Sequence, residues 1–155
     1  MGEIGEKMAE YFKTYINRHC GGLDDEVFPI LAKHTEWWGE TTAKDLLHTS
    51  MYDILDEDGN LLGFFGNSLW NHGGELECVL CNAYVKPEYR GIGLFNKMVK
   101  YTIDHNNEAK TVVIGAMDGN KLANTIYSRK FAVMYHDDEE RGTWYMIKDR
   151  RGKKP

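Results

Sequence analysis

A glycine-containing segment at residues 85–95, VKPEYRGIGLF, carries the residue types and spacing of an anion site. The surrounding pattern predicts a strand before this segment and a helix after it. A helix N-terminus presents unpaired N–H groups with about half a positive charge. Gly91 and Gly93 let the backbone approach a ligand closely. These features favour a pyrophosphate site, whereas a tight strand-to-helix turn would require the same glycines for its geometry alone.

Two common nucleotide-binding functions do not fit this segment. It lacks the G-x-x-x-x-G-K-[ST] pattern of nucleoside triphosphatases. It also lacks the complete G-x-G-x-x-G pattern of dinucleotide-binding folds. The sequence therefore disfavours both functions.

The sequence contains three cysteines, Cys20, Cys78 and Cys81, of which the last two form a C-x-x-C, but their context disfavours both a metal site and a redox site. Cys78 and Cys81 stand three residues apart in a predicted strand, where successive side chains alternate between the two faces of the sheet. A second cysteine pair, which a zinc site would require, is missing from the sequence. We expect reduced structural thiols and no metal.

Size and charge limit the classes of partner. The 155 residues suit one domain, which we place at residues 1–149, followed by a basic tail at 150–155 that we expect to be disordered. A net charge of -5 argues against nucleic acid as a partner. No apolar run approaches the roughly 20 residues of a membrane span, and no signal peptide is apparent, so we expect a cytoplasmic protein. A monomer and a homodimer both remain open.

The apolar spacing in the first fifty residues predicts helices. Apolar side chains at positions 8, 11, 12, 15 and 16 follow the period of an amphipathic helix, which we expect over residues 5–19. Gly21 and Gly22 would end this helix. Further helices are predicted at residues 25–33 and 42–48.

The next stretch predicts a meander of three antiparallel strands at residues 51–55, 61–69 and 75–85. The first turn has the sequence DEDGN, and Asp-Gly between apolar runs is a strong hairpin signal. The second turn, NHGG, contains two glycines.

The second half of the chain alternates helices and strands. We expect helices at residues 93–106 and 121–128, a buried strand at 111–117, and a final hairpin from 130–135 and 143–148. This order predicts an α/β (α+β) fold in which helices flank a mixed, mostly antiparallel sheet.

The glycine loop resembles the acetyl-CoA loop of the Gcn5-related N-acetyltransferase (GNAT) superfamily. Its pattern V-x-P-x-Y-R-G-x-G precedes a predicted helix. Arg90, Gly93 and Phe95 take the places of the family's Arg or Gln, Gly, and small residue. The resemblance covers about residues 50–148 and places the loop at the junction of the fourth strand and the third helix.

A second stretch is similar to a later motif of the same family. It reads Asn120-x-x-Ala123-x-x-x-Tyr127 and is followed by Phe131. In the family, this helix follows the fifth strand and lies along the cofactor. Two motifs in the expected order are more specific than either alone.

The resemblance implies transfer of an acetyl group from acetyl-CoA to an amine by direct attack. Backbone amides at residues 90–96 would hold the pyrophosphate, and a strand amide near residues 83–85 would stabilise the oxyanion. The implied cofactor-binding residues are Ala83, Tyr84, Val85, Arg90, Gly91, Ile92, Gly93, Leu94, Phe95, Asn96, Asn120, Ala123 and Tyr127.

An amine acceptor requires a base, because a lysine-like amine with a pKa of about 10.4 is mostly charged at neutral pH. Glu75 and Glu77 lie on the strand from which the family often draws its base, and strand period puts them on one face. Glu77 is the preferred candidate, and Glu75 or a water relay is the alternative. Solvated strand-end charges would have the same pattern. The family motif makes Tyr127 the candidate general acid for the departing thiolate, although a ring packed on the sheet would also fit.

The acceptor itself is less defined by the sequence. The acidic run at residues 137–140 lies in the hairpin loop that borders the family's acceptor pocket, and it would attract a small cationic molecule or a protein lysine or N-terminus. A solvated loop explains the run equally well. Glu36, Trp37 and Trp38 could wall the same pocket or join the core.

The four histidines considered as site residues, His34, His48, His72 and His136, have no metal-ligand spacing and are expected at the surface. His72 is a minor alternative base. A different class of function also remains open, namely a non-catalytic acyl-CoA-binding or protein-interaction module with the same fold.

Overall fold

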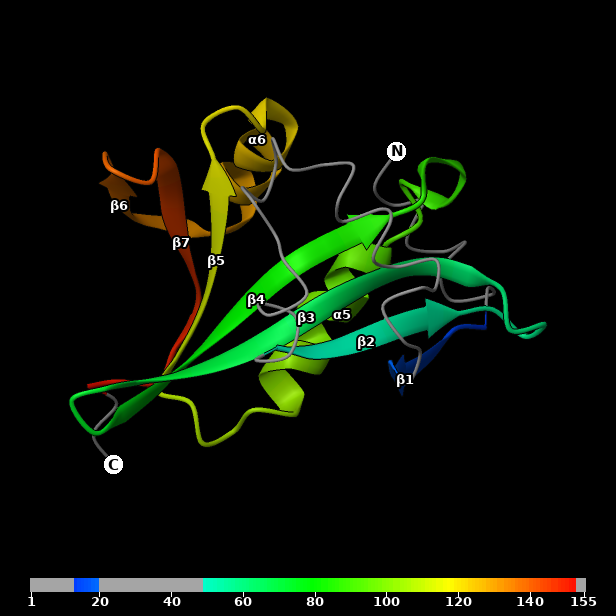
Figure 1. Cartoon of the computed structure of the whole chain (residues 1–155), viewed down its shortest axis with the longest axis horizontal. Coiled ribbons are helices and arrows are strands. Elements are labelled where there is room, and N and C mark those ends of the chain that lie inside the picture. Colours follow the sequence, from blue (N-terminus) through cyan, green and yellow to red (C-terminus); the bar gives the residue numbers. More distant parts are fainter. Residues whose placement is uncertain (1–12, 20–48, 153–155) are drawn as a thin grey trace.

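A computed structural model describes residues 13–19 and 49–152, which form one twisted sheet of seven strands with helices beside it (Figure 1). The strand order is β1-β2-β3-β4-β5-β7-β6, and β4 and β5 are the parallel pair. The strands are β1 (Tyr15–Arg18), β2 (Ser50–Leu55), β3 (Leu61–His72), β4 (Glu75–Val85), β5 (Thr111–Met117), β6 (Ala132–Asp137) and β7 (Gly142–Asp149). The helical elements are the 3-10 helix η1 (Pro87–Tyr89) and the helices α5 (Leu94–Asp104) and α6 (Lys121–Lys130).

The meander β2-β3-β4 confirms the three predicted antiparallel strands. Asp56 stabilises the first turn by accepting hydrogen bonds from the backbone N–H groups of Asp58 and Asn60. Gly73 and Gly74 form the second turn with positive φ angles, which suits a two-residue hairpin of primed type. Both turns therefore form where the sequence predicts them.

The predicted helix over residues 5–19 is wrong at its C-terminal end, where the structure has strand β1. β1 pairs antiparallel with β2, with Tyr15 opposite Leu55 and Arg18 opposite Tyr52. Ile16 packs against the core while Tyr15 stays exposed, so the period-two alternation of a strand replaces the helical stripe here. The unpaired edge of β2 supplies hydrogen bonds that the local helical pattern does not anticipate. Residues 5–12 and the helices predicted at 25–33 and 42–48 lie outside the described residues.

β4 is the strand around which the sheet divides. Its pairing with β5 covers only Glu77 to Leu80 on β4 and Thr111 to Ile114 on β5. Beyond these residues the two strands separate, as Figure 1 shows. The separation leaves the backbone edge of β4 after Leu80 facing a gap instead of a neighbouring strand.

A bulge in β4 lies at the start of this gap. Phe64 pairs with Tyr84 and Gly66 pairs with Cys81, so Phe65 on β3 opposes both Asn82 and Ala83 on β4. Asn82 has a positive φ of 51°, a conformation that Asn tolerates better than most residues. The extra residue shifts the side-chain alternation, because Leu80 before the bulge and Ala83 after it both belong to the core cluster that contacts α5.

α5 is fixed to the sheet by an apolar face and by a buried polar network. Leu94 and Met98 are buried in the main core. Asn67 on β3 donates its side-chain N–H to Thr102 Oγ1 at 2.9 Å, and Asn106 donates to Asn67 Oδ1 at 3.1 Å. Because buried amides must be hydrogen-bonded, this network specifies where α5 lies along β3.

The C-terminal hairpin confirms the two predicted strands, with β7 between β5 and β6. The described part of the chain continues to residue 152. Arg150 donates hydrogen bonds to the backbone oxygens of Asn106, Ala109 and Ile103. These contacts tie the end of β7 to the connection between α5 and β5.

Candidate active site

The gap between β4 and β5 holds a cavity of about 790 Å³, here called the first cavity. Its floor is formed by core side chains of β4, β5 and α5, including Leu80, Ile114 and Met98. Its rim is formed by the glycine loop on one side and by α6 on the other. The volume falls within the range of about 300 to 1,000 Å³ that is typical of small-molecule and cofactor sites.

The glycine loop has the geometry expected of an anion site. Gly91 and Gly93 adopt left-handed conformations with φ of 82° and 86°, and Gly93 is the N-cap of α5. The N-terminus of α5 therefore opens on the rim of the first cavity, and its N-cap, Gly93, has no side chain with which to cap the first N–H groups. A ligand phosphate is the kind of group that such amides bind.

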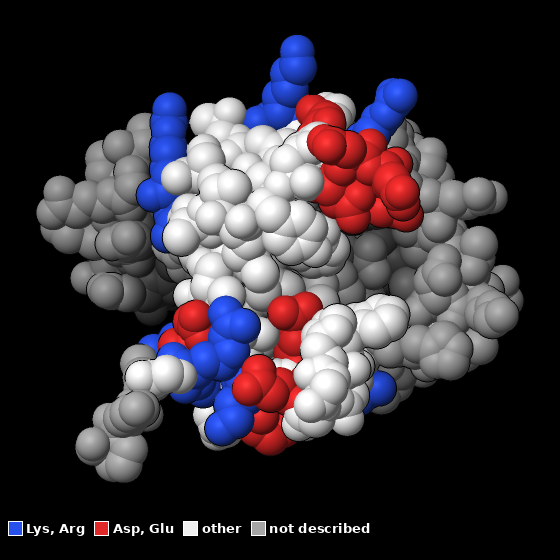
Figure 2. Space-filling model, turned by 90° about the vertical axis from the view of Figure 1, so that its left-hand side faces the viewer, with Lys and Arg blue, Asp and Glu red and all other residues white. Residues whose placement is uncertain are grey.

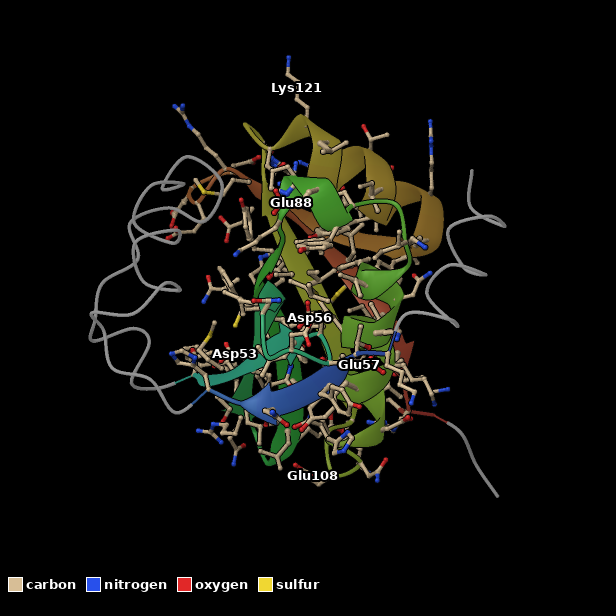
Figure 3. The ribbon with its side chains drawn as sticks, turned by 90° about the vertical axis from the view of Figure 1, so that its right-hand side faces the viewer. Asp53, Asp56, Glu57, Glu88, Glu108 and Lys121 are labelled. Atoms are coloured by element: carbon tan, nitrogen blue, oxygen red, sulfur yellow. The ribbon has the colours of Figure 1, made fainter. Side chains whose placement is uncertain are left out.

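Two basic side chains of the rim are held in defined positions. Arg90 donates its Nε–H to the Val85 oxygen at 2.9 Å and lies over the Tyr84 ring at 5.6 Å from its centroid. Lys130 on α6 donates to Asn96 Oδ1 on α5 at 3.0 Å. Lys130 thus connects α6 to the first turn of α5. Figure 3 shows Glu88 and Lys121 at this end of the molecule and Glu108 at the opposite end.

The first cavity collects all but one of the cofactor-binding residues predicted from the sequence. Ile92 is the exception, because its side chain packs against the core cluster instead of lining the cavity. The predicted residues that line it are Ala83, Tyr84, Val85, Arg90, Gly91, Gly93, Leu94, Phe95, Asn96, Asn120, Ala123 and Tyr127.

Asn120 begins α6 as the second motif predicts. Its side-chain oxygen accepts the Ala123 N–H at 3.2 Å, which is a typical N-cap contact. The cap sets the helix direction and brings the next two turns of α6 along the cavity wall. Sequence reasoning missed Leu122 and Ile126, which also line the cavity and are exposed. The exposed apolar side chains on this helix were the available signal.

Tyr127 lies among aromatic rings at the wall of the first cavity. Its ring stacks on Phe95 with centroids 5.4 Å apart and meets Tyr145 edge-on at 5.7 Å. Burial, with a smaller contribution from Tyr145, raises the pKa of Tyr127 to about 12. The phenol is therefore protonated at neutral pH and can donate a hydrogen bond. Within residues 13–19 and 49–152, its hydroxyl has no hydrogen-bonding partner.

A second cavity of about 620 Å³ lies on the other face of the sheet. Val79 and Val113 form part of its floor, whereas their neighbours Leu80 and Ile114 face the first cavity. Three aromatic side chains from different strands line it, namely Trp70 of β3, Tyr135 of β6 and Trp144 of β7. The two cavities share Cys81 and Asn82, the residues at the β4 bulge.

Glu75 and Glu77, the candidate bases, both line the second cavity. The Glu77 carboxylate accepts a hydrogen bond from Thr111 Oγ1 at 3.0 Å, and its other oxygen lies 3.4 Å from His72 Nε2. Its side chain is 23% exposed, so it is only partly solvated. The structure thus places Glu77 in a cavity wall with defined neighbours, while Glu75 is more exposed.

The acidic run at residues 137–140 lines neither cavity. Asp137 accepts the backbone N–H groups of Glu139 and Glu140, and Asp138 contacts His136, which also contacts Asp118. Figure 2 shows acidic side chains gathered at one corner of this side of the molecule. The hydrogen bonds that the imidazole donates to Asp138 and then to Asp118 raise the pKa of His136. The turn is therefore a local charged cluster outside the two cavities.

The two cysteines of β4 are free thiols in different surroundings. Cys78 is buried with Ala109 and Val112, whereas Cys81 lines both cavities. Burial is the main cause that raises the pKa of each thiol to about 12, so neither forms a thiolate readily. This agrees with the prediction of structural thiols. Cys20, Glu36, Trp37, Trp38, His34 and His48 lie outside the described residues.

Trp144 and Gly115 were missed as site residues by sequence reasoning. A side chain at Gly115 would meet the Trp144 ring at 3.1 Å, so the glycine leaves room for the Trp144 indole, which lines the second cavity. A glycine inside the β-branched run TVVIGAM was the available signal, because it marks a close approach of another group.

A model of the acetyltransferase (GNAT) family matches residues 10–133. The chain belongs to this family. The match spans most of the chain and includes β1 to β5, the helices α5 and α6 and the start of β6. No curated protein matches the sequence.

Solved GNAT structures have the same fold. An Elizabethkingia anophelis GNAT acetyltransferase with acetyl-CoA bound gives a TM-score of 0.62 at 15% identity, covering 86% of this chain and 94% of that one. A Bacillus subtilis acetyltransferase in complex with CoA gives 0.62 at 15% identity, covering 86% and 97%. Arabidopsis thaliana Naa50 in complex with the bisubstrate analogue CoA-Ac-MVNAL gives 0.60 at 15% identity, covering 86% and 96%. The acyltransferase family is therefore established for this chain, whereas these neighbours describe its fold.

Proposed function

We propose that this GNAT protein transfers an acetyl group from acetyl-CoA to an amine by direct attack of the amine on the thioester. The observation that carries the proposal is the meeting of two cavities from opposite faces of the sheet at Cys81 and Asn82. Such an arrangement lets two substrates approach one point without occupying the same space.

Acetyl-CoA suits the first cavity. Its pyrophosphate would accept hydrogen bonds from the backbone amides between Arg90 and Asn96, at the N-terminus of α5. The rest of the cofactor would follow the edge of β4 that β5 leaves unpaired after Leu80. Backbone N–H groups of this edge, near Ala83 and Val85, would donate to the thioester oxygen as negative charge develops on it.

Glu77 would take the proton from the acceptor ammonium. It stands four residues before Cys81 on β4, which corresponds to about 13 Å along a strand. Bridging water in the second cavity would therefore carry the proton from the amine to the carboxylate. Glu75 lies further from the junction and would act mainly by attracting a cation.

Tyr127 would assist departure of the CoA thiolate. Its phenol carries a proton, lines the first cavity and has surroundings that disfavour its ionisation. A phenol with a pKa of about 12 is a much weaker acid than a thiol, for which about 8.5 is usual. Hydrogen-bond donation in the transition state is therefore its main contribution, in preference to complete proton transfer.

A cationic amine suits the second cavity, because Glu75 and Glu77 supply negative charge and the aromatic walls favour cations and apolar groups. Both a small amine and a protein lysine or N-terminus meet this description. The bisubstrate analogue bound by Naa50 carries a peptide, and this favours including peptide N-termini among the acceptors tested.

The test is to incubate the protein with acetyl-CoA and a panel of polyamines, aminoglycosides, amino acids and peptides. Release of the free CoA thiol would be measured with and without each amine, together with the mass of the acetylated product. The proposal predicts amine-dependent thiol release. Binding of acetyl-CoA without release by any amine would instead support the non-catalytic module.

A further inference from the structure

The candidate base has a polar neighbour to which the mechanism above gives no role. His72 is the last residue of β3, and Glu77 follows the two-glycine turn on β4. His72 pairs with Glu75, and Trp70 pairs with Glu77, so His72 and Glu77 are diagonal neighbours on one face of the hairpin. Their closest atoms, His72 Nε2 and Glu77 Oε1, are 3.4 Å apart.

Glu77 presents its two oxygens to different partners. Oε2 accepts the Thr111 hydroxyl hydrogen at 3.0 Å, and this bond holds the carboxylate against β5. Oε1 is left on the side of His72. The carboxylate is thus oriented with one oxygen toward the imidazole.

The two side chains differ in their access to solvent. The Glu77 side chain is 23% exposed, whereas the His72 side chain is 63% exposed near the end of the hairpin. A base that takes a proton in each turnover must release it before the next one. Imidazole is a stronger base than a carboxylate, so a proton on Glu77 passes favourably to a neutral imidazole beside it.

We propose that His72 relays the proton from Glu77 to solvent, a role that rests on the acetyl transfer proposed above. The acceptor ammonium loses a proton, which bridging water carries to the Glu77 carboxylate. The nitrogen lone pair then attacks the thioester carbon, the C–S bond breaks, and the departing CoA thiolate takes up the second proton of the nitrogen. The Glu77 O–H gives its proton to His72 Nε2, and the resulting imidazolium releases a proton from Nδ1 to water or buffer. Proton exchange with solvent then restores the tautomer in which Nε2 is unprotonated. Glu77 is then again a carboxylate.

Charged groups around this pair set its pH dependence. Glu75 lies opposite His72, and Arg151 lines the same cavity, where it is bound to Asp149 through Nε at 3.1 Å. When His72 is already protonated, Glu77 faces a cation and is a weaker base. The relay therefore predicts that kcat rises with pH as neutral imidazole replaces imidazolium, and that this rise is absent when the imidazole is removed.

The test uses the full chain and an amine that the wild type acetylates. His72→Ala should lower kcat by about tenfold at pH 7, within the usual contribution of acid–base groups, and should remove the rise of kcat with pH near neutrality. Free imidazole in the buffer should restore much of the lost rate in proportion to its concentration. His105→Ala is the matched control, because this exposed histidine at the end of α5 lines neither cavity.

Three results would overturn the relay: a His72→Ala enzyme with the wild-type kcat and pH profile, a loss that imidazole does not restore, or an equal loss in His105→Ala. A wild type that acetylates no amine would instead refute the proposed acetyl transfer. A circular dichroism melt of each variant identifies a failure of folding. If His72→Ala does not fold, His72→Gln, measured for the same pH profile, takes its place.

Discussion

The first cavity and the second cavity share Cys81 and Asn82 but are built in different ways. The first is formed mainly by continuous segments, namely the second half of β4, the glycine loop with the start of α5, and α6, and most of its wall is apolar. The second is formed by single residues of β3, β4, β5, β6 and β7, with two carboxylates and three aromatic rings. Under the proposed function, the acyl donor would be bound by a local motif, whereas acceptor choice would depend on residues brought together only by the sheet.

The largest effect should come from the first cavity at Tyr127. Tyr127→Phe deletes the hydroxyl and keeps the ring that stacks on Phe95, so kcat should fall by about 10²-fold or more while acetyl-CoA binding changes little. Tyr15→Phe, on the exposed edge strand β1, is the matched control. A wild-type kcat in Tyr127→Phe would mean that Tyr127 has only a packing role.

The pKa of Tyr127 gives the same residue a second test. A raised pKa means that the phenol keeps its proton as pH increases, up to about 12. The kcat of the wild type should therefore show no decrease attributable to Tyr127 between pH 8 and about 10. A decrease near pH 10 in the wild type that disappears in Tyr127→Phe would contradict the burial argument.

In the second cavity, Glu77→Gln should lower kcat by about 10- to 100-fold at neutral pH. The kcat of the variant should recover as pH approaches the pKa of the amine, because the acceptor then loses its proton without a base from the protein. The matched control is Glu57→Gln, in the exposed turn between β2 and β3. An equal loss at every pH would show that Glu77 has a structural role instead of acting as a base.

Gly91→Val tests the anion site in the first cavity. Gly91 has a φ of 82°, and a Cβ added there would meet no other atom within 4 Å; Gly59 in the β2-β3 turn has a φ of 81° and equally open surroundings. Valine should cost both positions similar stability, roughly 1 to 2 kcal/mol. Only Gly91→Val should also raise the Kd for acetyl-CoA, by about tenfold, as measured by calorimetry. An unchanged Kd for acetyl-CoA in the folded variant would mean that the pyrophosphate binds elsewhere.

The smallest effect is expected from the acidic run, which lies outside both cavities. Changing the carboxylates at residues 137–140 to amides should raise the KM for a cationic amine by about twofold to threefold at low salt, and the effect should vanish as salt screens charges over about 10 Å at 0.1 M. Amides at Glu57 and Asp58 provide the control. A fold-increase in KM larger than the fold-decrease in kcat expected for Glu77→Gln would mean that the run contacts the acceptor directly.

Much of the sheet could be predicted from the sequence because its signals are local. The Asp-Gly and Gly-Gly turns, the β-branched run TVVIGAM and the Asn120 cap each act within a few residues, and the strands and α6 formed where expected. The apolar period at residues 8–16 instead predicted a helix. Strand β1 forms there because its residues pair with β2, which lies 34 to 40 residues later in the sequence. A strand edge provides no signal in the segment that pairs with it.

The candidate site also combines features with local sequence signals and features that depend on strand pairing. All of the predicted cofactor-binding residues except Ile92 line the first cavity, because the loop and the second motif are each continuous in sequence. The bulge at Asn82, the indole of Trp144 over Gly115 and the contact of His72 with Glu77 could not, since each depends on the register between strands. Register is fixed by the whole sheet, so a single sequence defines these contacts weakly.

Initial-velocity kinetics test most directly the claim that two substrates meet at the shared residues of the two cavities. Acetyl-CoA and an accepted amine would be varied together, and reciprocal plots compared. Direct attack within a ternary complex predicts intersecting lines, and no acetyl group on the protein after incubation with acetyl-CoA alone. Parallel lines, with an acetyl adduct on Cys81, would show a covalent ping-pong route and contradict the account.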